Sequence, residues 1–480
     1  MRMLFAVVCV AGCATSPSHA PGWAPERGDG RGLERPGAAL ASPPAAAPVD
    51  LSALVRSLAA LIPRPPAIAA PYGAEVRSVR FVATTALRKQ PSAAADKVGV
   101  IARDARARPI AAAAGPGCAG RWIAIAPRGW ACETAVRPSA DEPTAAAALD
   151  DDADPVRGVY GVVRGPGVTA FASRADAEAG ERAQVLTGAT SVRARGVVAI
   201  DGRRYWITTG GQLIDAAAIA TISPSRFRGV ALDATTTLPL AWTHAHGKPR
   251  AQVALRDAPD PAAAITGELA PRTVVAIVEQ AGDFVRTPDG WLARADLRVA
   301  ALAEPPPDTA PDERWFDIDL DEQVLVAYEG ARPVYATLVS TGKWDRKTPA
   351  AIARVAAKLE TATMVSEKRD LYSVADVPWT MYYDRSFALH TSYWHDGFGD
   401  PRSHGCVNLA PRDARALYHW SSPDVPPGWT AVYGDTDNPG SLIRVRSRAE
   451  PAPALRGYAR AMQDRTMQAR RDADPAAARR

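Results

Sequence analysis

The sequence predicts a mainly β protein, with two to three small β-barrels followed by a larger β-rich domain that carries a few short helices. The stretches Arg121–Cys132 and Asp283–Leu297 each contain a short aromatic-led strand, a tight turn with glycine and a second short strand. An apolar run, Thr273–Val278, precedes the second of these stretches. From Phe316 to Leu320 every second residue is apolar, as in a half-buried strand. A chain of 480 residues has room for two to four such domains.

The amino terminus is typical of an export signal. One arginine precedes the apolar run Leu4–Val10, which is far shorter than the about 20 residues that span a bilayer. The run leads into Val10-Ala11-Gly12-Cys13, which resembles a bacterial lipobox. That resemblance implies that residues 1–13 are a lipoprotein signal peptide and that Cys13 is lipidated. The alternative is an ordinary signal peptide cleaved after Ala20.

With a lipidated Cys13, the protein is expected to be exported to the periplasm and anchored to a membrane by lipid. No acidic residue directly follows Cys13, which favours the outer membrane.

Composition divides the rest of the chain. Residues 14–74 are rich in proline, alanine and glycine, which predicts a flexible tether. An acidic stretch at 141–155 and a proline-rich stretch at 305–311 predict two further linkers. The expected domains lie at 75–140, 155–222, 226–303 and 312–447, followed by a basic tail at 448–480. The tail holds eight arginines and four acidic residues, so it supplies most of the net charge of +5.

The three small units share an internal pattern. The first and third open with similar segments, Ala86-Leu-Arg88 and Ala254-Leu-Arg256, and all three contain an aromatic-led strand followed by a turn with glycine. Repeats of this size with short strands predict small β-barrels. The units resemble bacterial SH3-like domains, least clearly at 155–222.

Cysteine spacing predicts one disulfide. Cys9 and Cys13 belong to the signal, and Cys118 and Cys132 lie fourteen residues apart across a strand and a turn. In an oxidising compartment such thiols are expected to pair, the alternative being two separate buried cysteines. Pairing leaves Cys406 as the one thiol outside a disulfide, and such a thiol in an exported chain suggests a reactive role.

The segment at 312–447 shows further regular elements. Val324–Tyr328 and Val334–Thr341 flank a turn and predict a hairpin, and Phe387–Thr391 predicts another strand. Pro411 suits a first helical position, so Arg412–Trp420 is expected to form a short helix.

The residue types that a thiol nucleophile needs occur at two places in this segment. They are His390 and the run Ser403-His404-Gly405-Cys406. A thiol is a weak nucleophile until a base takes its proton, and histidine suits that task near neutral pH. On an extended segment His404 and Cys406 share a face. The backbone N–H groups of Gly405 and Cys406 are placed to hold an oxyanion. The sixteen residues from His390 to Cys406 allow a loop to bring the two together.

This stretch resembles the signature of L,D-transpeptidase (YkuD-type) catalytic domains: a histidine, a spacer, Ser/Thr-His-Gly-Cys, and Asn or Arg two residues later, here Asn408. Ser340-Thr-Gly342 followed by Thr348-Pro349 resembles a second region of that family, with Ala351 where the family has glycine. The resemblance extends from Asp312 to Arg446.

The resemblance implies roles for individual residues. His390 is the expected base, the backbone carbonyl of Thr391 its orienting partner, and Cys406 the nucleophile. Thr391 stands where the family often has glycine. His404 and Ser403 would shape the site. Further candidates for substrate or oxyanion contact are Gly405, Tyr372, Trp394, Arg402 and Asn408. For Trp394 and His395, simple packing is an equally good interpretation.

The resemblance also implies an activity, that of a peptidoglycan L,D-transpeptidase. The thiolate would attack the carbonyl of the third, diamino-acid residue of a tetrapeptide stem and release the terminal D-alanine. The acceptor would be the amine of a second stem, a lysine of a wall-attached protein or a free D-amino acid, and with water the same fold would be a hydrolase. Thioester chemistry needs no cofactor or metal. The SH3-like units would bind wall peptides or glycans, or act only as spacers.

Other functions fit the sequence less well. A zinc site from His390, His395, His404 and Cys406 would consume the reactive thiol and lacks zinc-finger spacing. A papain-like peptidase needs a histidine well downstream of its cysteine, and only His419 follows Cys406. A lipid-anchored wall-binding protein without catalysis is a further alternative. No basic patch is interleaved with aromatics, so nucleic acid is not an expected partner. His244 and His246 lie far from any motif and are predicted to face solvent.

Overall fold

The computed structural model describes residues 71–146, 154–165, 167–186, 189–248, 250–307, 309–366 and 372–473. The predicted signal peptide, Cys13 and almost all of the predicted tether lie outside these residues. The described chain is mainly β, with several sheets and a few short helices, as the sequence predicts. None of its helices is long and apolar enough to cross a membrane.

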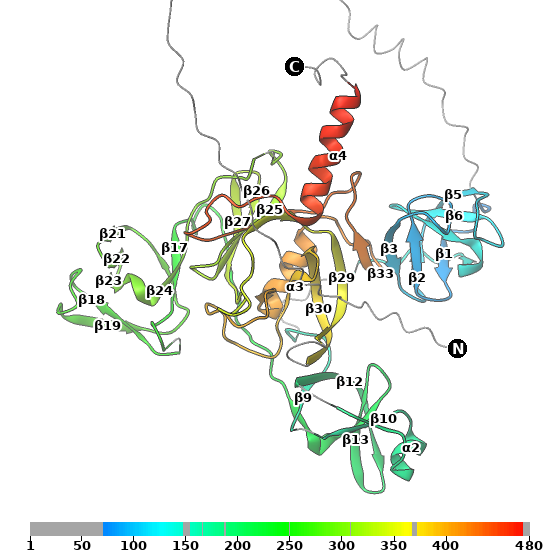
Figure 1. The fold of residues 1–480 in the computed structure, drawn as a ribbon, viewed down its shortest axis with the longest axis horizontal. Helices are drawn as coiled ribbons and strands as arrows, with labels where there is room; N and C mark the ends of the chain where they lie inside the picture. Colours follow the sequence, from blue (N-terminus) through cyan, green and yellow to red (C-terminus); the bar gives the residue numbers. More distant parts are fainter. Residues whose placement is uncertain are drawn as a thin grey trace, which may run out of the picture. The chain divides into compact units, whose positions relative to one another are not determined.

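The first group of strands packs around a core that it shares with Trp429 and Val432, far downstream in the chain (Figure 1). Its strands are β1 Ser78–Phe81, β2 Thr85–Arg88, β3 Lys97–Ile101, β4 Arg106–Ala107, β5 Pro109–Ala113, β6 Trp122–Ile125, β7 Trp130–Cys132 and β8 Val136–Ser139. Phe81, Leu87 and Ile123 are fully buried in that core. A disulfide joins Cys118 to Cys132, whose Cα atoms are 5.5 Å apart. The bridge therefore ties β7 to the turn before β6.

The second group contains the longest strand upstream of residue 312. Its elements are β9 Tyr160–Val163, β10 Thr169–Phe171, α2 Arg174–Ala179, β11 Ala183–Val185, β12 Ala189–Ile200, β13 Arg203–Thr208, β14 Leu213–Asp215 and β15 Ile219–Thr221. Ser173 caps α2, since its side chain accepts a hydrogen bond from Asp176 N–H. Strand β12 bends at a bulge between Ala194 and Gly196. Its two halves can therefore pair with different neighbours.

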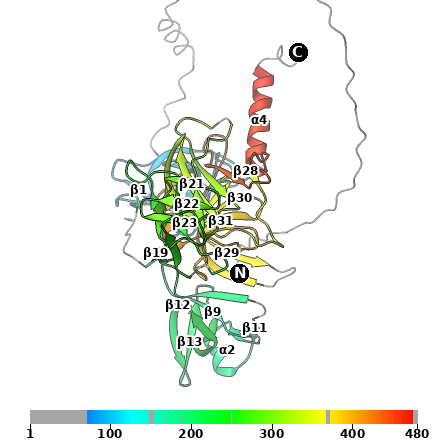
Figure 2. The ribbon, with the colours of Figure 1, turned by 90° about the vertical axis from the view of Figure 1, so that its left-hand side faces the viewer.

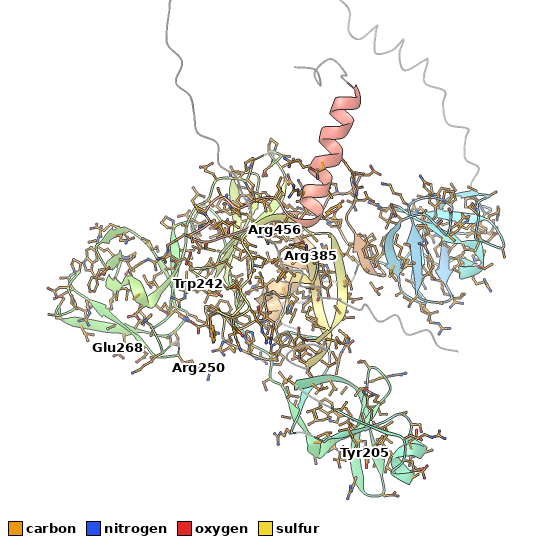
Figure 3. The ribbon with its side chains drawn as sticks, in the orientation of Figure 1. Tyr205, Trp242, Arg250, Glu268, Arg385 and Arg456 are labelled. Carbon is orange, nitrogen blue, oxygen red and sulfur yellow. A yellow bond between two sulfur atoms is a disulfide. The ribbon has the colours of Figure 1, made fainter. Side chains whose placement is uncertain are left out.

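The third group begins with a strand that pairs with the region after residue 312. The elements are β16 Val230–Ala231, β17 Leu240–Thr243, β18 Val253–Arg256, β19 Ile265–Leu269, β20 Val274–Ala276, β21 Glu279–Ala281, β22 Phe284–Thr287, β23 Gly290–Ala293 and β24 Leu297–Ala300. Figure 2 shows β21, β22 and β23 side by side, and β16 pairs instead with β27 (Arg332–Leu338). Trp242, labelled in Figure 3, is fully buried in a cluster with Trp315 and Phe398.

One prediction for this region is wrong. His246 is exposed as expected, but His244 is only 2% exposed. Its Nε2 lies 2.9 Å from Oδ1 of Asp400, a residue of the loop that precedes the thiol. The sequence shows no signal for this pairing, because the two residues are 156 positions apart.

The region after residue 312 is built from two sheets with a buried core between them. The first sheet has the order β16-β27-β26-β25-β34-β28, with β25 Arg314–Asp319, β26 Val324–Glu329, β28 Ala351–Arg354 and β34 Leu442–Arg446. The strands of the second are β29 Ala357–Ser366, β30 Tyr372–Asp384, β31 Phe387–Thr391, β32 Val407–Leu409 and β33 Trp429–Tyr433. Helix α3, Pro411–Trp420, contacts β30 and β31 and begins at the predicted proline (Figure 1). A second helix, α4, spans Gly457–Ala473.

A buried ion cluster joins the first and last strands of this region. Asp317 of β25 is 2% exposed and accepts hydrogen bonds from Arg444 and Arg446 of the parallel strand β34, at 2.6 and 2.8 Å. A buried carboxylate is tolerated only when charged donors surround it. The cluster thus fixes the register of β25 against β34.

Sheet ladders also cross the linkers that the sequence predicts. Strand β3 pairs with β33, β12 pairs with β30, and β16 pairs with β27. Backbone hydrogen bonds therefore connect each upstream group of strands to the region after residue 312.

The disulfide generates a prediction about local stability. Replacing Cys118 and Cys132 together by serine is expected to lower the free energy of unfolding of β1–β8 by about 3 kcal/mol, because the uncrosslinked loop gains entropy on unfolding. Amide hydrogen exchange followed by mass spectrometry measures the effect. Reductant should accelerate exchange in the wild type and leave the double variant unchanged. Equal protection in both proteins would contradict the prediction.

Candidate active site

The thiol of Cys406 opens into a pocket of about 320 Å³. Cys406 is half-buried and belongs to no disulfide. Besides residues of the region after 312, the pocket includes side chains from β9 and β12. Its lining residues are Val162, Ala189, Thr190, Ser191, Met364, Tyr372, Val374, His390, Trp394, Arg402, Ser403, His404, Cys406 and Asn408.

Two short parallel strands position the candidate base. Strands β31 and β32 pair so that His390 lies opposite Asn408, two residues after Cys406. His390 Nδ1 lies 2.8 Å from the backbone carbonyl oxygen of Thr391. That oxygen can only accept, so Nδ1 carries the proton and Nε2 is the proton acceptor of the ring. The carbonyl of Thr391 thus orients His390 in the tautomer that a base requires.

Burial sets the charge state of His390. The side chain is 2% exposed, and desolvation lowers the pKa of His390 to about 4, although the hydrogen bond to Thr391 opposes the shift. The imidazole is therefore neutral near pH 7. A neutral imidazole can take a proton from the thiol during attack.

The turn that carries the thiol is held by the side chain of Ser403. Its hydroxyl donates to the carbonyl oxygen of Cys406 at 2.5 Å and accepts from the N–H of Gly405 at 3.0 Å. Gly405 has φ +121°, and a Cβ there would come within 2.6 Å of the Phe387 ring. Only glycine fits this position without strain. Thr348 adds a further contact, since its hydroxyl donates to the carbonyl oxygen of Gly405 at 2.8 Å.

This turn does not fit the predicted oxyanion role of the Gly405 N–H. That group already donates to Ser403 and is buried. An N–H committed to another acceptor cannot stabilise developing charge without breaking that bond. Gly405 instead serves the turn itself.

Asn408 is held by a neighbouring histidine. Asn408 is 2% exposed, and its amide lies 3.0 Å from Nε2 of His395. The N–H of Gly397 donates to Nδ1 of His395, so Nε2 carries the proton and must donate to an oxygen. The amide of Asn408 is therefore assigned with its oxygen toward His395, and the other end of the amide is buried.

Burial also sets the charge state of His395, because desolvation, followed by Arg402, lowers its pKa to about 4. Its ring is therefore neutral near pH 7, as this hydrogen-bond pattern requires.

The remaining predicted residues line the pocket at different depths. Trp394 is half-buried, with its ring centroid 5.9 Å from that of His390. Tyr372, at the start of β30, lies 5.1 Å from the exposed His404, measured between ring centroids. Arg402 is exposed and also lines a second cavity, of about 570 Å³, with Lys248 and Arg272.

Contacts with the third group of strands fix the loop between the base and the thiol. Asp396 accepts hydrogen bonds from Arg272 at 2.7 Å and from Ser225 at 2.5 Å. Asp400 lies 2.9 Å from His244 and 3.7 Å from Arg298. Among the described residues, no three His, Cys, Asp or Glu side chains converge closely enough to hold a metal ion.

Sequence reasoning missed the pocket wall from the second group of strands. Val162 and Ala189–Ser191 reach the site because β12 pairs in parallel with β30, with Ala189 opposite Tyr372. No local motif marks these residues. Only the long-range ladder places them there.

Comparison with known proteins agrees with this geometry. Residues 313–433 match the family model of the L,D-transpeptidase catalytic domain, YkuD. No curated protein matches the chain.

Among solved structures, an L,D-transpeptidase (Yku) from Stackebrandtia nassauensis is 24% identical over 29% of this chain and 58% of its own, with a TM-score of 0.21. The catalytic domain of an E. faecium L,D-transpeptidase is 23% identical over 28% of this chain and 98% of its own, with a TM-score of 0.23. An L,D-transpeptidase from Mycobacterium tuberculosis H37Rv is 16% identical over 37% and 71%, with a TM-score of 0.22.

The chain thus spans 58% of the length of the Stackebrandtia protein. The SH3-like resemblance of the upstream units and the lipoprotein signal stay predictions. Over residues 313–433, the family match confirms the resemblance found in the sequence. These residues are an L,D-transpeptidase catalytic domain of the YkuD family.

Proposed function

We propose that this protein is a peptidoglycan L,D-transpeptidase with Cys406 as its nucleophile. The observation that carries the proposal is the placement of a buried, neutral His390 and of Cys406 in one pocket within the matched domain. A thiol and a base with a defined tautomer in one pocket are parts that acyl transfer through a thioester needs.

The first half-reaction forms the thioester. Sγ of Cys406 attacks the carbonyl carbon of the third, diamino-acid residue of a tetrapeptide stem, and its proton passes to Nε2 of His390. The C–N bond then breaks, and His390 returns the proton to the amine of the departing D-alanine.

The second half-reaction transfers the acyl group. An amine attacks the thioester carbon, the C–S bond breaks, and the thiolate recovers a proton through His390. A second stem, a protein lysine and a free D-amino acid are all acceptors of suitable chemistry, and water would make the protein a hydrolase.

The proposal includes a location. The lipobox-like Cys13 and the proline-rich segment after it support an exported protein, held at a membrane by lipid, whose catalytic domain reaches the wall. The upstream strands then either bind wall polymers or support the catalytic region.

The nucleophile is tested by active-site acylation. Cys406→Ala is expected to abolish the release of D-alanine from a tetrapeptide muropeptide and to remove the covalent adduct formed with a carbapenem, because Cys406 is the one thiol among the described residues that line the pocket. Intact-mass spectrometry of wild type and variant provides the measurement. An adduct that persists in Cys406→Ala would contradict the assignment of Cys406 as the nucleophile.

The base is tested by pH dependence. His390→Ala is expected to lower kcat/KM for D-alanine release by more than ~10²-fold. In the wild type, kcat/KM should fall on the acid side only toward pH 4, since His390 stays neutral above its lowered pKa of about 4. His246→Ala, an exposed histidine, is the matched control and should behave as wild type. If kcat/KM instead began to fall near pH 6.5, His390 would be in contact with water and its pKa would not be lowered as stated here.

The anchor is tested by fractionation. The wild type is expected to sediment with membranes when expressed in a bacterium with lipoprotein processing, because acyl chains on Cys13 add about 0.8 kcal/mol of binding per buried methylene. Cys13→Ala should move the protein to the soluble fraction or block its maturation. Membrane retention of a mature Cys13→Ala protein would argue against lipidation.

A further inference from the structure

We infer that the exposed ring of Trp344 binds a sugar of the wall glycan, and that it holds the strand whose peptide stem enters the thiol pocket. Trp344 lies in the loop 343–347 between β27 and β28 and is 85% exposed. Tryptophan is highly buried on average in folded proteins, so a ring this exposed is unusual. This inference rests on the proposed function, because it concerns how the donor substrate of that reaction is held.

Hydrogen bonds at both ends fasten this loop to the turn that carries the thiol. The N–H of Lys343 donates to the carbonyl oxygen of Ser403 at 3.1 Å, and Gly342 forms a parallel bridge with Ser403. At the other end, the hydroxyl of Thr348 accepts from the N–H of Gly342 and donates to the carbonyl oxygen of Gly405, both at 2.8 Å. The loop therefore begins and ends at the active-site turn.

A tight turn directs the ring into solvent. The N–H of Arg346 donates to the carbonyl oxygen of Lys343 at 2.8 Å, which places Trp344 and Asp345 at the two central positions of a four-residue turn. A Cβ on Gly342 would come within 2.0 Å of the carbonyl oxygen of Arg346, so the backbone closes on itself just before the turn. The backbone thus holds Trp344 outward.

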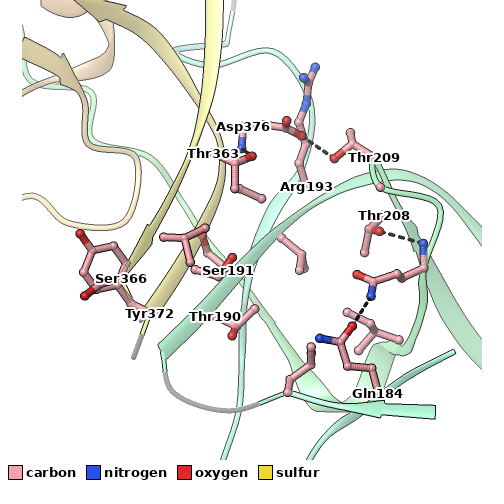
Figure 4. A pocket seen from close by; sticks show the side chains of 18 of the residues that line it. Gln184, Thr190, Ser191, Arg193, Thr208, Thr209, Thr363, Ser366, Tyr372 and Asp376 are labelled. Carbon is pink, nitrogen blue, oxygen red and sulfur yellow. Dashed lines mark hydrogen bonds between the residues drawn. The ribbon is translucent and has the colours of Figure 1, made fainter. Parts of the chain in front are cut away.

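Trp344 faces open surface rather than a cavity. It lines neither the thiol pocket, nor the cavity of about 570 Å³ beside Arg402, nor the chamber of about 610 Å³ between β11–β14 and the hairpin β29–β30 (Figure 4). Small molecules bind mostly in concave sites. A flat ring on open surface next to an active site is better suited to one face of an extended polymer.

The charges around the ring favour an anionic polymer. Lys343 and Lys347 flank the turn, both are exposed, and neither has an ion pair among the described residues. Asp345 lies 3.6 Å from Nε of Arg346. Three basic residues against one acidic residue leave the loop with a charge of +2. A peptide stem carries carboxylates, among them that of its terminal D-alanine, so this loop attracts a strand that bears such stems.

The position of the ring suits the sugar that bears the reacting stem. Trp344 follows Gly342 by two residues, so its Cα lies at most about 7 Å from that of Gly342. In the proposed reaction the thiol attacks the third residue of the stem, and three extended residues place the sugar about 10 Å from the thiol. The negative face of the indole attracts the partly positive C–H groups on the face of a sugar ring.

A membrane surface is the other common partner of a tryptophan between lysines. The attachment of the loop to the active-site turn favours the glycan, because the same turn receives the stem of the wall polymer. Stacking on the glycan and entry of the stem can then occur together on one strand.

The test compares two donors that differ in the sugar, using the purified full chain. One is a tetrapeptide carried by the disaccharide of N-acetylglucosamine and N-acetylmuramic acid, and the other is the same tetrapeptide with an acetyl cap instead. Trp344→Ala is expected to raise KM for the disaccharide donor at least ~5-fold and KM for the capped peptide less than ~2-fold, because only the first loses a stacking partner. For both donors kcat should stay within ~2-fold of wild type.

Matched variants separate stacking from a general loss of apolar surface. Trp344→Tyr keeps an aromatic face and should recover most of the affinity, whereas Trp344→Leu should behave like Trp344→Ala. Leu302→Ala shortens another exposed apolar side chain, 60% exposed and outside the loop, and should match the wild type.

Binding can also be measured without catalysis. In the Cys406→Ala background, calorimetry with a disaccharide tripeptide, which has no D-alanine to release, reports affinity alone. Adding Trp344→Ala should weaken this affinity at least ~5-fold, in line with the change in KM.

The outcomes are distinct. Equal changes for both donors in Trp344→Ala, or none for either, would overturn the role of the ring in binding sugar. Sedimentation of the Cys13→Ala chain with vesicles of phosphatidylglycerol and phosphatidylethanolamine that required Trp344, with KM for both donors unchanged, would assign the ring to a membrane instead. If the wild type released D-alanine from neither donor, the proposed function would fail, whereas the calorimetry would still decide whether Trp344 binds the sugar.

Discussion

The parallel pairing of β31 with β32 is the constraint on which the rest of the site depends. It sets His390 opposite Asn408 and brings Cys406 to the end of the neighbouring strand. Parallel strands need a long crossover, here the loop after Thr391. That loop contains little regular structure, so its position comes from Asp396 and Asp400, which contact Arg272 and His244 of the third group of strands. The catalytic constellation is therefore stabilised partly by residues far upstream in the chain.

Neutral histidines give the site a particular resting state. Burial lowers the pKa of both His390 and His395 to about 4, so neither ring contributes a positive charge near pH 7. An adjacent imidazolium would favour the thiolate, which is the form that oxidants attack. A neutral pair supplies no such charge beside Cys406.

Structural features that depend on a few consecutive residues could be predicted from the sequence, whereas contacts between distant parts of the chain could not. The alternation at 316–320 and Pro411 correctly indicated a strand and a helix, because side-chain periodicity and proline geometry act over a few residues. The histidine and the thiol could be found because their motif is short. The role of His395 in orienting Asn408, the burial of His244 and the commitment of the Gly405 N–H could not, since each depends on a partner chosen by the tertiary fold. The wall from β12 left no trace in sequence at all, because backbone ladders place few demands on side chains.

The ladders that cross the predicted linkers have a consequence for dissecting the molecule. A fragment that begins at residue 312 would lose β3, β12 and β16, and so would expose unpaired backbone along β33, β30 and β27. Open strand edges of this kind pair with strands of other chains and so promote aggregation. The upstream strands thus act as edge protection for the catalytic sheets, and a well-behaved minimal enzyme would need either those strands or charged substitutions on the exposed edges.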